Sequence, residues 1–201
     1  MNLILASQSP YRRALLEQAG LTFQVFPPPF EEEKFRDTHQ KLSPKDLCQE
    51  LSLQKALSVH QIKPGNFIIG SDQLIEIDHK ILGKPGGLKK AHEQLSVLSG
   101  RRHFLHTSLT LIAPNKKTFS TLRTTVVKLQ SLTHEEIDAY LHVDHPFDCA
   151  GSYKMERAGL LLADSIECSD PSAIQGLSLI DLVKGFKHFG RSPFEFRKDA
   201  L

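Results

Sequence analysis

The 201-residue sequence has only three cysteines, and their positions argue against a disulfide-framed fold. Cys48, Cys149 and Cys168 form no C-x-x-C pair, and an odd number of cysteines leaves at least one without a partner in the chain. Small secreted domains that depend on disulfides usually have more cysteines in even numbers. A reducing cytoplasm is therefore the expected compartment.

Common metal and phosphate motifs are also missing. The ten histidines include no H-E-x-x-H, and no set of cysteines or histidines has the spacing of a structural zinc site. Neither a Walker loop nor a G-x-G-x-x-G is present. A nucleotide phosphate would therefore have to be bound by another arrangement of residues.

Long apolar runs and a strong charge of one sign are absent too. The N-terminal apolar run is short and is followed by polar residues and arginines, so we expect neither a signal peptide nor a membrane span. With 40% hydrophobic and 24% charged residues, the chain can bury a core as one domain or two small lobes. A net charge of +2 gives no basic field for a duplex, so neither nucleic acid nor a membrane is an expected partner.

The most informative stretch spans residues 66–85 and reads NFIIGSDQLIEIDHKILGKP. Its pattern predicts a strand that stops at Gly70 and Ser71 and resumes at Leu74. Asp72 is thereby placed between two apolar runs. A carboxylate in such a place costs several kcal/mol to desolvate unless it is paired, protonated or bound to a cation.

The second half of this stretch predicts a hairpin. Asp78 and His79 have the character of a turn, and the returning segment ends at Lys84, which would bring an amine back towards the same sheet. By local pattern alone, a plain hairpin with a solvated Asp and Lys is the more common outcome. A meeting of acid and base is the functional alternative.

Two arginines stand at the start of a predicted helix. Ser9 suits the N-cap and Pro10 the first helical position. Arg12 and Arg13 then face the positive end of the helix dipole, which is unfavourable by a few tenths of a kcal/mol or more each. An anion would reverse the sign, because the free N–H groups, the hydroxyls of Ser7 and Ser9 and both guanidinium groups can cradle a phosphate. Equally, both arginines can point to water.

Further charges appear in the next segment. The three glutamates at 31–33 predict a solvated loop, which can also give one ligand to a hard divalent cation. In the helix predicted after Ser43, Lys55 falls in register with Leu51 and Val59 and so lies on the apolar stripe. Either its stem packs while the ammonium reaches water, or the lysine points into a cleft.

The rest of the chain predicts a sheet framework with covering helices. A capping box from Thr133 to Glu136 marks the start of one helix. Residues 148–156 have the small side chains of a loop that a ligand can approach closely, although an ordinary connector fits as well. The other expected elements are strands at 3–6, 21–26, 103–112 and 118–130, an apolar segment at 160–166, and helices at 88–98 and 174–189.

Six short motifs occur in order along the chain. They are LASQSPYRR at 5–13, GSDQ at 70–73, GKP at 83–85, LSG at 98–100, EIDAY at 136–140 and DCAGS at 148–152. Together they resemble the motifs of the Maf-like nucleoside triphosphate pyrophosphatases, over nearly the whole chain. The resemblance is closest to the subgroup that acts on 7-methyl-GTP, because Ser-Asp-Gln and Cys-Ala-Gly-Ser-x-Lys-x-Glu stand where other Maf proteins carry different residues.

The resemblance implies a fold and a reaction. The fold would be α/β, an elongated mixed β-sheet flanked by helices with two lobes around a deep central cleft, similar to inosine triphosphatase, and residues 1–201 would form a single Maf-like domain. The reaction would be hydrolysis of the α–β phosphoanhydride of 7-methyl-GTP to the nucleoside monophosphate and pyrophosphate, assisted by Mg²⁺ or Mn²⁺. Nucleotide-pool housekeeping would be the role, and a homodimer is a reasonable expectation.

The resemblance also implies roles for individual residues. Asp72 resembles the catalytic carboxylate and proton acceptor, and it shares the role of metal ligand with Glu32. Attack of water on a polyphosphate needs a base, and cations that neutralise the phosphoryl oxygens. Which of the two carboxylates binds metal and which takes the proton stays open. The cations and donors expected to face the triphosphate are Lys55, Lys84, Ser7, Arg12 and Arg13.

Base choice is expected to depend on Tyr11, Gln73 and Glu156. A 7-methylated guanine carries positive charge on its ring, so the face of Tyr11 would add a cation–π energy of about 0.5 to 2 kcal/mol. Glu156 would accept hydrogen bonds from the guanine N–H edge, and Gln73 would complete the polar contacts. Tyr11 stands where the subgroup usually has Trp, and Ser108 and Ser178 stand where the family more often has Gly and Pro.

Two other functions remain open from the sequence. One is a pyrophosphatase for dTTP, UTP or another non-standard nucleotide. The second is a regulator of cell division that senses a nucleotide without hydrolysing it, although a pure binder has no need of a base such as Asp72. A nucleic-acid-binding module is a weaker third alternative, since basic residues with interleaved aromatics are lacking.

Overall fold

The computed structural model describes residues 2–197, which divide into two compact units. Within these residues, the first unit consists of 2–72, 107–123 and 170–197, and the second of 73–106 and 124–169. Three long strands contribute residues to both units. The single domain expected for residues 1–201 stays a prediction.

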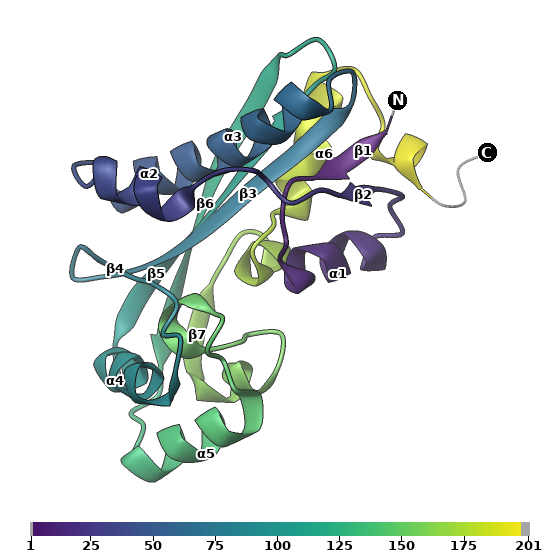
Figure 1. The fold of residues 1–201 in the computed structure, drawn as a ribbon. Coiled ribbons are helices and arrows are strands. Elements are labelled where there is room, and N and C mark those ends of the chain that lie inside the picture. The colour runs from purple at the N-terminus through teal and green to yellow at the C-terminus, as the bar shows by residue number, and fades with distance from the viewer. Residues whose placement is uncertain (1, 198–201) are drawn as a thin grey trace. The chain divides into compact units, whose positions relative to one another are not determined.

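A seven-stranded mixed sheet runs through the chain (Figure 1). Its order is β2-β1-β3-β5-β6-β7, and β4 pairs with β3 outside this path. β1 is parallel to both of its neighbours, whereas β4 and β7 are antiparallel to theirs. The strands are β1 (Leu3–Leu5), β2 (Gln24–Val25), β3 (Phe67–Ile77), β4 (Lys80–Leu82), β5 (Arg102–Ile112), β6 (Thr118–Leu129) and β7 (Ala163–Glu167). The predicted α/β class with a mixed sheet is confirmed.

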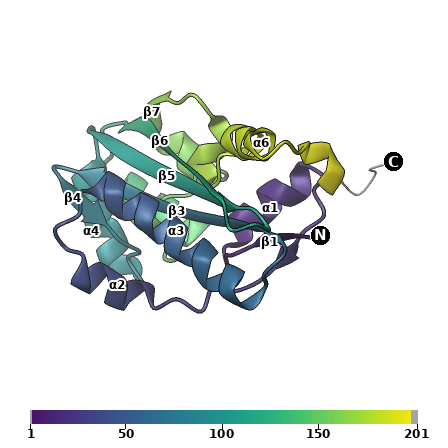
Figure 2. The same ribbon diagram turned by 90° about the horizontal axis from the view of Figure 1, so that it is seen from above.

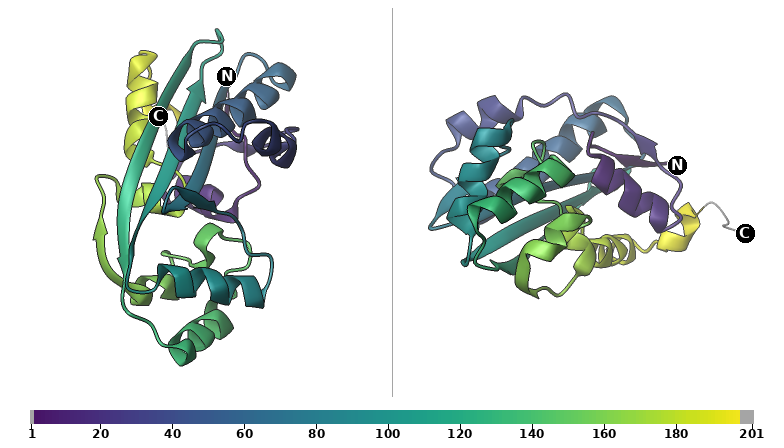
Figure 3. Two further views of the ribbon diagram at one scale, coloured as in Figure 1. Left: turned by 90° about the vertical axis from the view of Figure 1, so that its left-hand side faces the viewer. Right: turned by 90° about the horizontal axis from the view of Figure 1, so that it is seen from below.

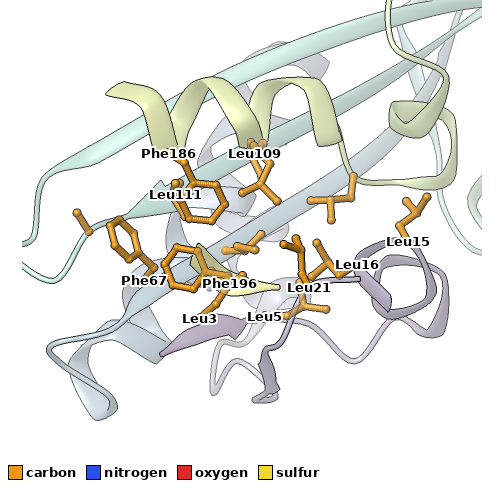
Figure 4. Packing of buried hydrophobic residues seen from close by; sticks show 14 residues of the cluster. Leu3, Leu5, Leu15, Leu16, Leu21, Phe67, Leu109, Leu111, Phe186 and Phe196 are labelled. Carbon is orange, nitrogen blue, oxygen red and sulfur yellow. The ribbon is translucent and has the colours of Figure 1, made fainter. Parts of the chain in front are cut away.

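Different helices cover the two faces of the sheet in the first unit (Figure 2). Successive side chains of a strand point to opposite faces, so Leu3 and Leu5 of β1 join one cluster while Ile4 joins the other. The cluster of Leu3 includes residues of α1 (Pro10–Gln18) and α6 (Leu179–His188), among them Phe186 of α6 (Figure 4). Ile4 packs instead with residues of α3 (Pro44–Ile62).

The central strand β3 is unbroken, so the predicted interruption at Gly70 and Ser71 is wrong. A Cβ at Gly70 would lie 2.2 Å from the carbonyl oxygen of Ser52 and 2.8 Å from the Cβ of Ala56. Both neighbours belong to α3, so the glycine permits close packing of that helix on the strand. Asp72 is therefore presented by a continuous strand and not by a turn.

The predicted hairpin after β3 is confirmed. Asp78 and His79 have φ values of 49° and 60°, the left-handed conformation that a tight two-residue connection requires. Ile77 then pairs with Lys80 at the start of the antiparallel strand β4. The chain turns back along β3, as the spacing of the turn residues indicated.

The second unit contains α4 (Leu88–Leu98) and α5 (His134–Asp144), which lie side by side (Figures 1 and 3). Both helices were predicted, and α5 begins with the expected capping box between Thr133 and Glu136. A short 3₁₀ turn, Ala150–Ser152, packs against α4. Among the helices of residues 2–197, none combines the length and the apolar character needed to cross a bilayer.

Two N-terminal elements differ from expectation. The strand predicted at 21–26 is reduced to β2, Gln24–Val25, and both of its residues are exposed. The acidic run expected to be a loop instead opens a seven-residue helix, α2 (Glu32–Thr38). Two glutamates in its first turn suit the positive end of the helix dipole, which gives this short segment a local reason to be helical.

Two C-terminal elements are also shorter than predicted. The apolar segment at 160–166 divides into a 3₁₀ turn, Ala158–Leu162, and strand β7. The helix expected at 174–189 begins only at Leu179, because Gly176 has a φ of 97° and Ser178 serves as the N-cap. A left-handed glycine ends the preceding turn and separates it from the helix.

Candidate active site

Asp72 is buried in the middle of β3, with 3% of its surface exposed. Its Oδ1 accepts a hydrogen bond from Nζ of Lys55 at 2.5 Å. Lys55 lies on α3 and is itself only 8% exposed, so its ammonium does not extend into water. The solvent-reaching alternative for this lysine is therefore wrong, and its position in a substrate cleft stays a prediction.

Glu32, in the first turn of α2, binds the same ammonium. Its Oε2 lies 2.6 Å from Nζ of Lys55, and its Oε1 accepts hydrogen bonds from Nε and Nη2 of Arg36 at 3.0 and 2.6 Å. Burial raises the pKa of Glu32, but the charges and hydrogen bonds of Lys55 and then Arg36 outweigh it and lower the pKa to about 2. Glu32 is therefore ionised at neutral pH.

Arg36 closes a ring of alternating charges. Its Nη2 lies 3.6 Å from Oδ2 of Asp72, an oxygen that is buried and has no hydrogen-bond partner among residues 2–197. Each carboxylate therefore faces Lys55 with one oxygen and Arg36 with the other. These four residues, Glu32, Arg36, Lys55 and Asp72, are called the four-charge ring below, and their formal charges sum to zero.

The two carboxylates of the four-charge ring fit a divalent cation that arrives with a phosphate. Within the described part of the chain, no group of three or more His, Cys, Asp or Glu side chains is placed to hold a metal ion. Mg²⁺, however, is often bound by one or two carboxylates, with water and substrate phosphates as its other ligands. Oδ2 of Asp72, which accepts no hydrogen bond from residues 2–197, is a suitable oxygen for that purpose.

The serines and Arg12 at the start of α1 form a second polar cluster of the first unit. Oγ of Ser7 accepts from the backbone N–H of Ser9 at 3.1 Å and from Nη1 of Arg12 at 3.3 Å. Nε of Arg12 donates to the carbonyl of Gly176 at 2.9 Å, and the Ser71 hydroxyl donates to the same carbonyl at 2.7 Å. Arg12 is therefore held by the protein and does not simply point to water.

Arg13 behaves differently from Arg12. Its Nε donates to Glu17 at 2.7 Å, one turn along the exposed face of α1, and 62% of its side chain is exposed. This matches the solvated alternative, and a phosphate contact of Arg13 stays a prediction. Tyr11, expected to contact the base, is half-buried in the first turn of α1.

The remaining predicted residues lie on three segments of the second unit. Gln73 follows Asp72 in β3 and is half-buried. Lys84 is exposed in the loop after β4, and Glu156 is exposed in the loop after the 3₁₀ turn Ala150–Ser152. Desolvation by the surrounding chain raises the pKa of the Glu156 carboxyl group. Within the first unit, the structure thus brings together Asp72, Lys55 and Glu32.

Lys154 anchors the loop that carries Glu156. Its buried ammonium lies 3.3 and 3.4 Å from the carbonyl oxygens of Asp144 and His145, at the C-terminal end of α5, and 3.3 Å from Oδ1 of Asp148. A cation is favourable at this negative end of the helix. The predicted small-residue loop is therefore fixed to α5 by the Lys154 side chain and by the hydroxyl of Tyr140, which accepts from the backbone N–H of Lys154 at 2.9 Å.

A profile of the family described as Maf-like protein matches residues 2–189. The chain belongs to the Maf-like protein family. The Maf chain is 41% identical over 191 residues to a protein of Bordetella pertussis named 7-methyl-GTP pyrophosphatase, covering 95% of this chain and 94% of that protein. A protein of Xanthomonas oryzae with the same name is 40% identical over 188 residues, covering 94% and 96%.

Two solved structures share less sequence with the Maf chain. The Ham1 protein of Staphylococcus aureus is 12% identical, with a TM-score of 0.41 over 95% of this chain and 100% of that one. A nucleoside-triphosphatase, or dITP/XTP pyrophosphatase, of Mycobacterium abscessus is 14% identical, with a TM-score of 0.37 over 66% and 76%. At TM-scores below 0.5, neither comparison adds to the account of the site.

Both serines that depart from the usual Maf pattern are buried and hydrogen-bonded. Oγ of Ser178 donates to Asp170 at 2.5 Å and caps α6, and Oγ of Ser108 donates to the carbonyl of Thr121 at 3.1 Å. The carbonyl of Ser108 accepts from Ser71, the neighbour of Asp72. Both serines therefore have hydrogen-bond partners close by. Neither serine belongs to the four-charge ring.

Arg36 is the one ring member that the sequence prediction missed. The available signal was the spacing of four residues between Glu32 and Arg36, which allows a pair on one helix face. That signal applies only to a helix, and the acidic run was expected to be a loop. In the Maf chain the pair depends on α2.

Proposed function

We propose that the Maf chain is a nucleoside triphosphate pyrophosphatase, a hydrolase that cleaves the α–β phosphoanhydride of 7-methyl-GTP and releases the nucleoside monophosphate and pyrophosphate. The observation that carries the proposal is the buried carboxylate of Asp72, held by Lys55 beside Glu32. The relatives about 40% identical to the chain support the choice of substrate by their name. The activity would serve nucleotide-pool housekeeping in the cytoplasm.

Charge neutralisation is the first requirement of the reaction. Hydrolysis of a polyphosphate is promoted mainly by positioning and by cations that offset charge on the phosphoryl oxygens. Because the charges of the four-charge ring already sum to zero, further cations must face the triphosphate. In the proposal these are Arg12, Arg13 and Lys84, together with the divalent cation, and the hydroxyl of Ser7 adds a donor.

The two carboxylates have different tasks in the proposal. A group with a pKa of about 2, such as Glu32, is a weak proton acceptor at neutral pH, which favours Glu32 as a metal ligand. Asp72 then takes the proton of the attacking water, while the hydrogen bond from Lys55 to Oδ1 fixes the orientation of the carboxylate. The water oxygen bonds to phosphorus, and pyrophosphate leaves with the electrons of the broken P–O bond.

Mg²⁺ or Mn²⁺ is the proposed cofactor, with Glu32 and Asp72 as its protein ligands. When bound, such a cation offsets the charge of the phosphate oxygens. Both carboxylates come from regular elements, α2 and β3, which limits their movement. The chain thus contributes oriented oxygens and leaves the remaining coordination to substrate and water.

Recognition of the base is assigned to Tyr11, Gln73 and Glu156. Tyr11 offers an aromatic face to the positively charged ring of 7-methylguanine, and Glu156 and Gln73 offer polar contacts to its edge. A pocket that hydrogen-bonds a particular base discriminates strongly against one that leaves those bonds unmade. Lys154 supports this role of Glu156, because it fixes the loop to α5.

A substrate panel tests the proposal. Pyrophosphate release is measured from 7-methyl-GTP, GTP, dTTP, UTP and CTP with Mg²⁺ or Mn²⁺, using wild type and Asp72→Asn. We expect 7-methyl-GTP to be hydrolysed fastest, and Asp72→Asn to lose about 10²- to 10⁴-fold in rate. Faster turnover of dTTP or UTP would make the base assignment wrong. Nucleotide binding without turnover by folded wild type would favour the sensing function.

A further inference from the structure

We propose that Arg36 competes with a divalent cation for the carboxylates of Glu32 and Asp72, and is displaced from Asp72 when the cation binds. This inference rests on the proposed function, because it assumes that these two carboxylates are the metal ligands. In this inference Arg36 is a counter-ion of the two carboxylates, and the metal takes its place at Asp72.

The position of Nη2 of Arg36 is the first observation. This single nitrogen lies 2.6 Å from Oε1 of Glu32 and 3.6 Å from Oδ2 of Asp72. It therefore occupies the place between the two carboxylates on the side opposite to Lys55, whose Nζ bridges the other two oxygens. A cation that bridges Glu32 and Asp72 through these oxygens would need the same space.

The four contacts of the ring are unequal. Lys55 approaches both carboxylates within 2.6 Å and has 10% of its side chain exposed. Arg36 is 3.6 Å from Asp72, beyond hydrogen-bond distance, and leaves Oδ2 buried without a hydrogen bond. Mg²⁺ binds carboxylate oxygens at about 2.1 Å and would satisfy this oxygen more fully. The contact between Arg36 and Asp72 is therefore the one that a cation replaces.

Arg36 is the more exposed of the two cations in the ring. Its side chain is 28% exposed, against 10% for Lys55, and its hydrogen bonds go to Oε1 of Glu32, not to Asp72. Lys55 lies on a 19-residue helix and is buried. The two carboxylates, Lys55 and Arg36 carry a net charge of zero. When a divalent cation takes the place of Arg36, the net charge becomes +1. A positive site suits a triphosphate better than a neutral one.

Competition and orientation predict opposite changes in metal affinity when Arg36 is replaced. In Arg36→Met the competing charge is gone, so metal binding should become tighter. If Arg36 instead served to orient the carboxylates for the metal, the same substitution would weaken metal binding. The matched control is Lys34→Met, which removes one positive charge from the same helix at a side chain that is 77% exposed and pairs with Glu31.

The experiment is a titration of the full chain with Mn²⁺ in the absence of nucleotide, in which free Mn²⁺ is measured by electron paramagnetic resonance. We expect Arg36→Met to bind Mn²⁺ at least about fivefold more tightly than wild type, and Lys34→Met to stay within about twofold. Thermal unfolding checks that each variant is folded. If Arg36→Met fails to fold, Arg36→Gln keeps a hydrogen-bond donor for Glu32 without the charge and is expected to bind more tightly than wild type as well.

A second readout follows Arg36 directly. In wild type, the ¹⁵N-labelled guanidinium Nε–H signal of Arg36, identified by its loss in the variant, should shift on addition of Mg²⁺. The signal of Arg191, which pairs with Glu195 in another helical turn, should stay unchanged. An Arg36 signal that does not move at saturating Mg²⁺ would overturn the inference.

The outcomes separate this inference from the proposed function. Suppose that wild type binds Mn²⁺ and releases pyrophosphate, while Arg36→Met binds Mn²⁺ no more tightly than wild type. This result would overturn only the competition between Arg36 and the metal. Absence of both metal binding and pyrophosphate release in folded wild type would overturn the proposed function and the inference with it. Tighter binding by Arg36→Met with an unchanged Lys34→Met supports the inference.

Discussion

The ammonium of Lys55 lies 2.5 Å from Oδ1 of Asp72, and both side chains are buried between α3 and β3. Removal of one partner from such a pair leaves a buried charge without full compensation. We therefore expect Lys55→Met to lower the free energy of unfolding by about 3 kcal/mol, measured by urea denaturation at pH 7. The double variant Lys55→Met/Asp72→Asn should recover part of this loss. A loss below about 1 kcal/mol in the single variant would contradict the importance of the pair.

Close packing of α3 on β3 gives a second prediction. Gly70→Ala places a Cβ 2.2 Å from the backbone oxygen of Ser52, so the helix or the strand must shift. We expect a loss of roughly 1 to 3 kcal/mol in the free energy of unfolding. Gly83→Ala is the control, because a Cβ at Gly83 meets no atom within 4 Å. Equal stability of the two variants would show that the close approach has no energetic consequence.

A buried histidine in the second unit makes stability depend on pH. Burial lowers the pKa of His103 from its ordinary 6.5 to about 4, while the backbone of Arg101 acts in the opposite direction. The unfolded chain therefore takes up a proton first as the pH falls. The stabilising effect of the neutral imidazole is complete above pH 6.5 and is lost progressively towards pH 4.

The measurement compares wild type with His103→Gln, which keeps a hydrogen-bonding group opposite Tyr153 but does not titrate. Wild type should lose roughly 2 kcal/mol more than the variant between pH 7 and pH 5. The lowered carboxyl pKa values of Glu32 and Asp181, both about 2, affect stability only below about pH 4.5 and do not disturb this comparison. Parallel pH curves for both proteins would contradict the prediction.

Anchoring of the Glu156 loop gives a prediction for substrate binding. In Lys154→Met the loop loses its contacts with the end of α5, so we expect KM for 7-methyl-GTP to rise about tenfold or more with a smaller change in kcat. Discrimination against GTP should fall at the same time. Lys128→Met, which removes a lysine from an exposed pair with Asp164, is the control for loss of charge in the same unit. If kcat/KM for both substrates fell equally, the loop would have no part in base choice.

Local signals in the sequence were sufficient for much of the framework. Capping residues such as Ser9 and Thr133 mark helix starts through bonds made within one turn, and both were predicted correctly. The place of Lys55 on an apolar stripe was visible from helical periodicity, but whether its ammonium reaches water or is buried was left open by the sequence. Asp72 was identified because a carboxylate between apolar runs is unusual.

Other features depend on contacts that local pattern does not contain. Gly70 has the appearance of a turn residue, and only the approach of Ser52 on a separate helix explains its place in a continuous strand. The approach of Arg36 to Asp72 joins two residues that are 36 positions apart in the sequence. The late start of α6 is set by the left-handed Gly176, whose carbonyl binds Arg12 from the N-terminal helix.

The most direct test of the account is product analysis by ³¹P NMR, with 7-methyl-GTP and Mg²⁺, for wild type and Asp72→Asn side by side. The account predicts that wild type forms the nucleoside monophosphate and pyrophosphate, and that the folded variant forms them at least about 100-fold more slowly. Orthophosphate and a nucleoside diphosphate as the products, or full activity of Asp72→Asn, would contradict it.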